Sequence, residues 1–562
     1  MLARTIALWP GGPTLSLNDY FVWHKCFFSA AFILWAAGMV RWPNRRWLIG
    51  GAMALATLSW IALDLPLGRV YGLTTGGVAM GELAQPMVVA ARGVITEGWL
   101  VRAPNPSPLW SLVLATASGF NPDRLLSVYR WLPLISMWFF ASALYWGLGF
   151  VDEDERLAPG IGAGLAVFFV LFLASHRLSI FTTGPIWPQI FWLQPRLAFS
   201  LGLLAIWMRV LADARRLPGF VLAAALWGGV FWTEPRFGVY SLIGALAWAA
   251  VTRKYPPRWG APLFLALAAL VVFPFSGWLS LPDAEPGLLG WHEGLRRFFS
   301  MTIERGLVFY FGAFALFALL REGKRSALLF LSLTGSGFIL WFAASFSPAA
   351  SAKLDIALLD VYVRLLLTVA AGVGAQRVLI WLQAHWEPPA NLLPGYLRRR
   401  PAWVLAMAAF LGLSLPWCFP YWWHPVRMDE VYRDSYEPVA HQFIIFGEWI
   451  RRNTEPGSVF VAGPSYAPWI AALGGRRVLM IDGVETKDIS ARKLAQSHFA
   501  ASSDPNKVRA SARSWELTHY AGGRLDKRWI RVNYRNLRSS PEFEKVWQLR
   551  RWVSVFEFSE TQ

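Results

Sequence analysis

The chain has 562 residues, of which 55% are hydrophobic and 16% charged, and its 53 Lys and Arg against 35 Asp and Glu give a net charge of +18. A soluble protein of this size has about a quarter of its residues charged, so the composition excludes a disordered chain, a collagen, a disulfide scaffold and an ordinary cytosolic enzyme. It predicts a polytopic membrane protein whose excess Lys and Arg lie in cytoplasmic loops, and we therefore expect no nucleic-acid partner.

The amino-terminal segment, Met1 to Lys25, has no positively charged start followed by an apolar core and a small-residue cleavage site. We therefore expect no removable signal peptide, so that the first span targets the chain to the membrane. Only two cysteines are present, Cys26 and Cys418, and each lies in an apolar run. Neither a disulfide framework nor a cysteine metal site is therefore expected.

Apolar segments of spanning length recur along most of the chain. A helix needs roughly 20 mainly apolar residues to cross a hydrocarbon core about 30 Å thick, and polar or Pro/Gly-rich breaks divide this sequence into about 12 such segments. The predicted spans cover residues 25–41, 47–64, 125–149, 159–175, 191–211, 217–233, 238–252, 261–280, 306–320, 326–346, 358–381 and 402–420.

Basic clusters occupy alternate connections between these spans, at residues 41–46, 212–216, 253–258, 321–325 and 398–400. Basic residues in short loops mark the cytoplasmic side, which places the amino terminus and everything after Pro420 outside. Residues 1–420 are thus predicted to form the transmembrane domain, with a long first outer loop at 65–124 and another outer loop at 281–305. The second of these resembles an amphipathic interfacial helix, although most of its charges are explained by a solvated face.

The tail at 421–562 changes character, because its apolar runs are shorter and charges of both signs are interspersed. A helix ends near Thr454, a strand covers Ser458 to Gly463, a short helix is stopped by Gly474 and Gly475, and a second strand begins at Arg477. We predict a small soluble α/β domain on the outer surface. The predicted fold class is an all-α polytopic membrane protein with this α/β domain at its carboxyl end.

Nucleotide-driven and zinc chemistry are disfavoured by missing motifs. The sequence contains no Gly-x-x-x-x-Gly-Lys-Ser/Thr run and no His-Glu-x-x-His run. Candidate residues are instead acids and arginines at the outer ends of spans. Asp64 ends the second span, where a carboxylate in lipid would cost several kcal/mol, so it faces either a wet cavity or simply the water interface. Glu82 begins an amphipathic stretch in the first outer loop.

Two further sites lie on the predicted outer face. Glu234 and Arg236 belong to the tight turn Thr233-Glu-Pro-Arg-Phe237, where a simple linker needs no charge. Arg364 opens the eleventh span, and a guanidinium at that depth suits an anionic headgroup. The alternative for Arg364 is an ion pair with Asp360, four residues earlier on the same helix.

The whole layout resembles the polytopic glycosyltransferases of the C superfold, which take sugars from polyprenyl-phosphate donors. The first loop from Asp64 to the Pro-rich stretch ending at Trp110 is similar to the first loop of that family. Thr233-Glu-Pro-Arg236 resembles its Thr-Lys/Arg-Pro turn, and Tyr362-Val-Arg364-Leu-Leu-Leu resembles its Arg-Tyr-Leu-Leu-Pro opening of a late span. The stretches 448–464 and 469–479 resemble the opening of its outer carboxyl-terminal domain. One departure is that many members carry two adjacent acids where Asp64 is followed by Leu65.

The resemblance implies an inverting displacement at the anomeric carbon of the donor sugar, with polyprenyl phosphate leaving. Asp64 would be the general base, Arg364 and Arg236 would hold the phosphate, and Glu82 and Glu234 would complete the substrate site. It also implies a multi-pass protein of the bacterial inner membrane with membrane lipids and the polyprenyl-phosphate lipid as partners. No cofactor is implied with certainty, and a divalent metal ion and membrane protein partners stay open.

Two other functions remain open on the sequence. The missing second acid and the Trp-rich, basic surface also fit a non-catalytic membrane subunit or assembly protein built on the same scaffold. A lipid flippase or secondary transporter is the second alternative, although paired halves and ionisable residues at span centres, which transporters tend to show, are not evident.

Overall fold

A computed structural model describes residues 26–27, 30, 33–34, 51, 54–55, 108–120, 125–147, 195–252, 260–272, 307–322, 325–347, 350, 354–385, 440–463, 466–480, 489–501, 504–523, 543–549 and 553–558. The chain forms two compact units. The first comprises Met1–Leu63 and Leu132–Arg427, and the second comprises Asp64–Trp131 and Met428–Gln562.

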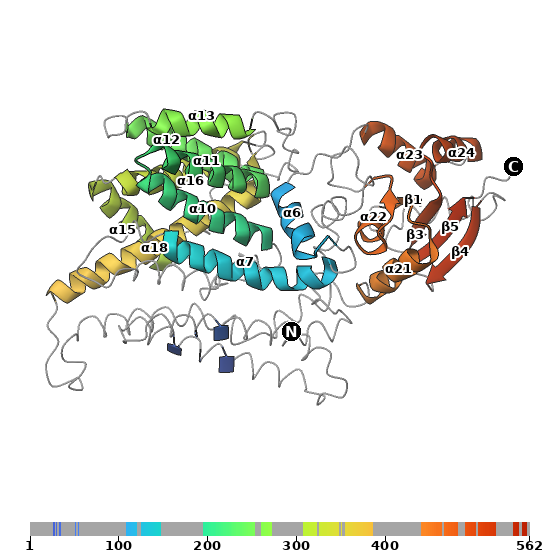
Figure 1. The fold of residues 1–562 in the computed structure, drawn as a ribbon, viewed down its shortest axis with the longest axis horizontal. Coiled ribbons are helices and arrows are strands. Elements are labelled where there is room, and N and C mark those ends of the chain that lie inside the picture. The colour runs from blue at the N-terminus through green and yellow to red at the C-terminus, as the bar shows by residue number, and fades with distance from the viewer. Residues whose placement is uncertain are drawn as a thin grey trace. The chain divides into compact units, whose positions relative to one another are not determined.

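Long helices make up the described part of the first unit (Figure 1). Eight of them coincide with predicted apolar segments, because a run that is apolar on all sides is stable as a helix buried in lipid or protein. They are α7 (Leu125–Gly147), which begins in the second unit, α10 (Pro195–Asp213), α11 (Leu217–Thr233), α12 (Pro235–Val251), α13 (Gly260–Val272), α15 (Leu307–Glu322), α16 (Arg325–Phe346) and α18 (Ile356–His385). A further helix, α6 (Pro108–Ala117), lies in the second unit.

Three of the described helices are long and apolar enough to cross a membrane, at Pro195–Asp213, Ser326–Phe346 and Leu358–Val378. Shorter apolar helices occur at Leu217–Thr233, Pro235–Val251 and Tyr310–Arg321. The number of about 12 spans stays a prediction. Four predicted spans, at 25–41, 47–64, 159–175 and 402–420, lie wholly or mostly outside the described residues, as do the loop 281–305 and most of 65–124.

Helix α18 is the central helix of this unit. In an 18-residue apolar window of its stretch Leu358–Val378, 83% of the residues are buried, and the helix packs against α12, α15 and α16. Glycines allow α15 to approach it closely: a Cβ atom added to Gly374 would lie 2.1 Å from the carbonyl oxygen of Phe311. A Cβ atom added to Gly312 would lie 2.9 Å from the carbonyl oxygen of Leu367. The two helices therefore touch through their backbones, as small residues permit at membrane helix interfaces.

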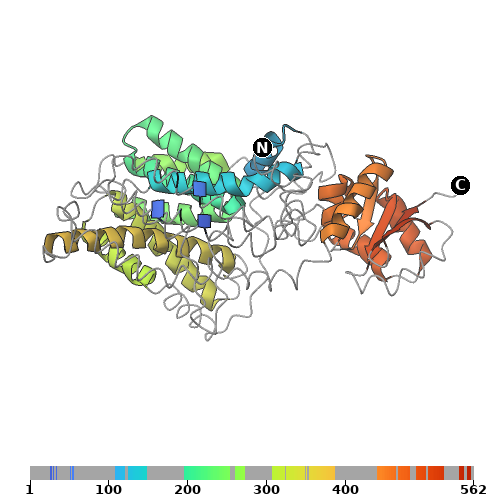
Figure 2. The same ribbon diagram turned by 90° about the horizontal axis from the view of Figure 1, so that it is seen from below.

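The second unit contains a mixed five-stranded sheet with the order β2-β1-β3-β5-β4. Its strands and helices after residue 440 are drawn in orange and red in Figure 2. Strand β1 is parallel to both β2 and β3, while β5 is antiparallel to β3 and β4. The predicted order of strand, short helix and strand is confirmed by β1, the helices α22 and η5, and β2. The elements are α21 (Ala440–Asn453), β1 (Val459–Ala462), α22 (Ala467–Trp469), the π-helix η5 (Ile470–Gly474), β2 (Arg477–Val478), α23 (Ile489–Ala501), α24 (Pro505–Ser514), β3 (His519–Gly523), β4 (Phe543–Leu549) and β5 (Val553–Phe558).

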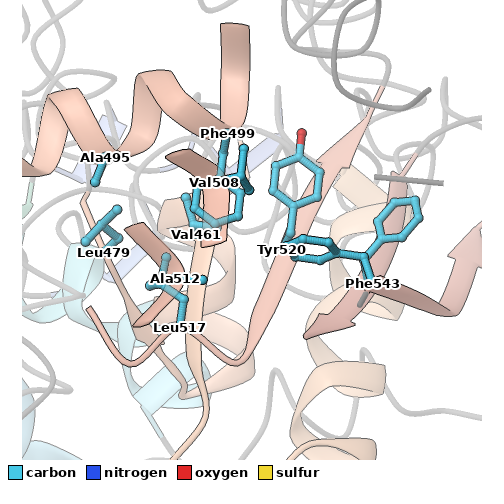
Figure 3. Packing of buried hydrophobic residues seen from close by; sticks show 10 residues of the cluster. Val461, Leu479, Ala495, Phe499, Val508, Ala512, Leu517, Tyr520 and Phe543 are labelled. Carbon is cyan, nitrogen blue, oxygen red and sulfur yellow. The ribbon is translucent and has the colours of Figure 1, made fainter. Parts of the chain in front are cut away.

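Side chains on one face of the sheet pack against α23 and α24 (Figure 3). Alternate residues of a strand point to opposite faces, so Val461, Tyr520 and Phe556 share this core. On β4, Trp547 stacks on Phe446 and Trp449 of α21, with ring centroids 5.9 and 4.8 Å away. The predicted α/β part of the chain therefore has its own core.

His519 is a buried titratable group of this sheet. Its ring stacks on Phe460 at 4.7 Å, and burial, reinforced by the neighbouring charge of Arg476, lowers its pKa to about 4. Arg476 itself holds the end of α21, because its guanidinium donates hydrogen bonds to the carbonyl oxygens of Arg451 and Thr454 at 2.8 and 2.6 Å. Because its pKa is about 4, the imidazole of His519 is uncharged at neutral pH.

This depressed pKa predicts acid-sensitive stability of the sheet. An unfolded histidine titrates near 6.5, so between pH 6.5 and 4 the unfolded state binds more protons than the folded state. Stability is then complete above about pH 6.5 and falls towards pH 4, by at most about 1.4 kcal/mol per pH unit. We expect hydrogen exchange of β1 and β3 amides in the full-length protein, corrected for intrinsic rates, to show this loss. His519→Gln should flatten it, and an equal acid sensitivity in that variant would contradict the assignment.

Candidate functional site

The turn predicted at Thr233–Phe237 is a single residue long. Helix α11 ends at Thr233 and α12 begins at Pro235, a residue that suits the first turn of a helix because its missing N–H is not needed there. Glu234 lies between them in an extended conformation, its amide donating to the carbonyl oxygen of Val230 at 2.8 Å. Its own carbonyl oxygen accepts from Gly238 at 3.2 Å. The backbone of Glu234 thus ends one helix and starts the next.

The Glu234 side chain is almost fully buried and forms an ion pair with Arg196. Arg196 Nη2 lies 2.9 Å from Glu234 Oε2, and the Glu234 side chain is only 3% exposed. Because Arg196 belongs to the first turn of α10, this pair joins α10 to the turn between α11 and α12. Arg196 was not among the site residues predicted from the sequence. Its signal was available, because Pro195-Arg196 begins an apolar helix just as Pro235-Arg236 does.

Arg236 reaches the residue that precedes α18. Its Nη1 donates to Asp355 Oδ2 at 2.6 Å, across 119 residues of sequence. The other carboxylate oxygen of Asp355 accepts from the amide of Leu358 at 3.4 Å, which caps the start of α18. One helical turn after Arg236, the hydroxyl of Tyr240 donates to the carbonyl oxygen of Leu354. The start of α12 is therefore tied twice to the start of α18.

Arg364 forms the ion pair with Asp360 that the sequence offered as an alternative to headgroup binding. Arg364 Nε lies 2.6 Å from Asp360 Oδ2, with the arginine side chain 9% and the aspartate 21% exposed. Helix α18 begins at Ile356, earlier than the predicted span, so both residues lie within its first turns. The charge pairing is thus established, and a role for Arg364 towards a ligand stays a proposal.

Three aromatic rings pack between these two helices. The ring of Tyr362 lies 5.9 Å from Phe237 and 5.6 Å from Tyr240, measured between centroids. Tyr362 also lies against α16, since a Cβ atom added to Gly337 would be 3.1 Å from its ring. The helices that carry Arg236 and Arg364 are therefore held together by a rigid apolar contact.

Each of three arginines on α10, α12 and α18 is paired with one acid, and we call the residues of these three separate ion pairs the arginine cluster: Arg196, Arg236, Arg364, Glu234, Asp355 and Asp360. Guanidinium groups form strong paired hydrogen bonds with carboxylates and phosphates alike, and they stay charged at any physiological pH. Among the described residues no three His, Cys, Asp or Glu side chains gather in a way that could hold a metal ion. The guanidinium groups of these pairs are of a kind that can bind an anion.

Two of the predicted site residues, Asp64 and Glu82, lie outside the described residues. Glu234 and Arg236 are two residues apart in the chain; Glu234 is joined to α10 through Arg196, and Arg236 is joined to the start of α18 through Asp355. Arg364 lies on α18 itself, as Tyr362 does. The catalytic role of Asp64 and the substrate contact of Glu82 remain predictions from the sequence.

No protein family matches the chain, and no curated protein is similar to it in sequence. A solved structure of the archaeal oligosaccharyltransferase AglB from Archaeoglobus fulgidus, in complex with an inhibitory peptide and a dolichol-phosphate, matches it with a TM-score of 0.51 at 12% identity. The match covers 84% of this chain and 69% of that chain. Another structure of the Archaeoglobus fulgidus oligosaccharyltransferase, tethered with an acceptor peptide, gives a TM-score of 0.48 at the same identity, covering 84% of this chain and 68% of that one. The chain thus shares its fold with the oligosaccharyltransferase structure that it matches at a TM-score of 0.51, in agreement with the resemblance drawn from the sequence.

Proposed function

We propose that this chain is an integral membrane glycosyltransferase that moves a sugar from a polyprenyl-phosphate donor to an acceptor on the extracytoplasmic face. The observation that carries the proposal is that Arg236 and Arg364 lie on α12 and α18, two helices that pack against each other through Tyr362. The shared fold supports it, because the matching oligosaccharyltransferase was solved with a dolichol-phosphate.

The proposed reaction is a single displacement. Asp64 takes the proton from the acceptor hydroxyl while the oxygen of that hydroxyl attacks the anomeric carbon of the donor sugar. The bond between this carbon and the phosphate oxygen breaks at the same time. The leaving phosphate carries its own negative charge and needs no proton, so positive charge is what stabilises it. Arg364 and Arg236 would supply that charge, and attack opposite the leaving group inverts the anomeric configuration.

The strongest alternative is a non-catalytic membrane subunit built on the same scaffold. The observation in its favour is that Arg196, Arg236 and Arg364 each contact a carboxylate, as arginines with a purely structural role do. That protein would co-purify with a larger complex and would leave the pool of lipid-linked sugars unchanged.

Deleting the gene and quantifying polyprenyl-phosphate sugars by mass spectrometry tests the proposal. We expect one lipid-linked sugar to accumulate and to return to its normal level when the wild-type gene is restored. Asp213→Asn, which breaks an ion pair in the last turn of α10 away from the cluster, should restore it equally well. An unchanged pool of every prenyl-linked sugar would reject the enzyme and favour the non-catalytic subunit.

A further inference from the structure

Both arginines assigned to the phosphate already hold a carboxylate. The contacts Arg236–Asp355 and Arg364–Asp360 are each 2.6 Å long, and each aspartate side chain is 21% exposed. The pairs are therefore short, yet they are less deeply buried than Arg196–Glu234, whose acid is 3% exposed. A phosphate that binds Arg236 or Arg364 would have to share that arginine with its aspartate or displace it.

The net charge of these ion pairs determines how a phosphate can bind to them. Each arginine is paired with one acid, so each pair carries no net charge. A phosphate that enters without displacing an acid places like charges side by side, which disfavours its charged form or its binding. Because a guanidinium binds carboxylate and phosphate through the same kind of charge-assisted bond, binding becomes an exchange of one anion for another.

The geometry makes such an exchange feasible at both pairs. Asp360 and Arg364 are on one helix, so rotation of side chains is enough to separate them. Asp355 uses one oxygen for Arg236 and the other for the amide of Leu358, so its carboxylate keeps a hydrogen bond after the arginine leaves. Asp355 is then not left as a buried charge without a partner, which is the costly outcome for an ion pair, and the Asp360 side chain is 21% exposed to solvent.

We propose that Asp355 and Asp360 are built-in competitors of the lipid phosphate, and that they limit the affinity of the site and favour a headgroup of low charge. The inference rests on the proposed function and names its substrate class as a phosphate monoester or diester lipid in preference to a diphosphate lipid. Each carboxylate repels a ligand in proportion to the charge of that ligand, so a diphosphate is penalised most.

A matched pair elsewhere in the chain provides the control. Arg209 Nε and Asp213 Oδ2 are 2.6 Å apart with the same four-residue spacing as Asp360 and Arg364, but they lie in the last turn of α10 with the aspartate 56% exposed. Removing that acid changes the charge of the protein by the same amount without touching the arginine cluster.

The test is lipid binding by the purified full-length protein in detergent, with farnesyl phosphate and farnesyl diphosphate as probes. Asp360→Asn should tighten farnesyl phosphate binding about three- to tenfold and diphosphate binding more, which is the size expected for losing one partly exposed charge interaction. Asp360→Glu and Asp213→Asn should stay within about twofold of wild type. Asp355→Asn repeats the test at the second pair, because an asparagine side chain still caps a helix.

The binding results distinguish a failure of this inference from a failure of the proposed function. Unchanged or weaker farnesyl phosphate binding in both folded asparagine variants, with binding by wild type intact, would overturn this inference and leave the proposed function standing. Failure of the wild type and of both variants to bind either lipid would reject the two together. Equal tightening for Asp213→Asn would also overturn it, because the effect would then be one of overall charge.

Discussion

Asp64→Asn is expected to abolish sugar transfer while the protein accumulates in the membrane at the wild-type level. Asparagine has nearly the same shape as aspartate but cannot accept the proton of the acceptor hydroxyl. General base catalysis contributes about 10²- to 10⁴-fold to rates, so the variant should fall to the detection limit of a membrane transfer assay. The measurement is transfer of labelled sugar from lipid extract to acceptor, normalised to the amount of protein on an immunoblot.

Glu82→Gln is the matched control, since it neutralises another acid of the first outer loop. As a substrate contact without a proton-transfer role, Glu82 should affect the donor or acceptor KM more than kcat. Transfer retained by Asp64→Asn and lost in Glu82→Gln would move the base to Glu82. Transfer retained by both variants would leave the chemistry to residues that the sequence did not indicate.

Gly374→Ala should prevent stable assembly of the helical unit. The added Cβ would lie 2.1 Å from the carbonyl oxygen of Phe311, and that oxygen belongs to helix backbone rather than to a flexible side chain. Helices α15 and α18 would have to separate, losing the packing along the interface that α18 buries most tightly. Overpacking of this kind costs about 3 kcal/mol or more, a large share of the stability of a typical domain. The measurement is the yield of monodisperse protein and its melting temperature in detergent.

Gly335→Ala provides the comparison, because the Cβ added there on α16 would meet no atom within 4 Å. The same substitution at that site should be neutral or stabilising by about 0.4–1 kcal/mol, since alanine is the better helix former. Equal yields and melting temperatures for the two variants would mean that α15 and α18 are not in backbone contact.

Much of the helical architecture could be predicted from local sequence. The span expected at 217–233 is helix α11 with the same bounds, and that at 326–346 is α16 with one residue more. Such agreement follows from the length of apolar runs and from breakers such as Pro218 and Pro235, which act within a few residues. For the same reason the pair Asp360–Arg364, spaced by one helical turn, could be foreseen.

Contacts between distant segments could not be predicted in this way. Arg236 and Asp355 are 119 residues apart, and nothing in the period of either helix specifies that they meet. The partner of Glu234, Arg196, depends likewise on how α10 lies against the turn. In the sheet, β1 and β2 were recognisable as neighbouring strands, whereas β3 inserts beside β1 after two intervening helices. Pairings of this kind follow from tertiary packing rather than from local pattern.

The buried position of α18 has a consequence for the way the protein is made. This helix carries Asp360 and Arg364, and charged side chains are costly in contact with lipid. Its neighbours α12, α15 and α16 all precede it in the chain, and translation proceeds from the amino terminus. When α18 leaves the ribosome, these three neighbours among the described helices have therefore already been synthesised. The order of the segments along the gene thus allows these neighbours to be in the membrane before the charged residues of α18 enter it.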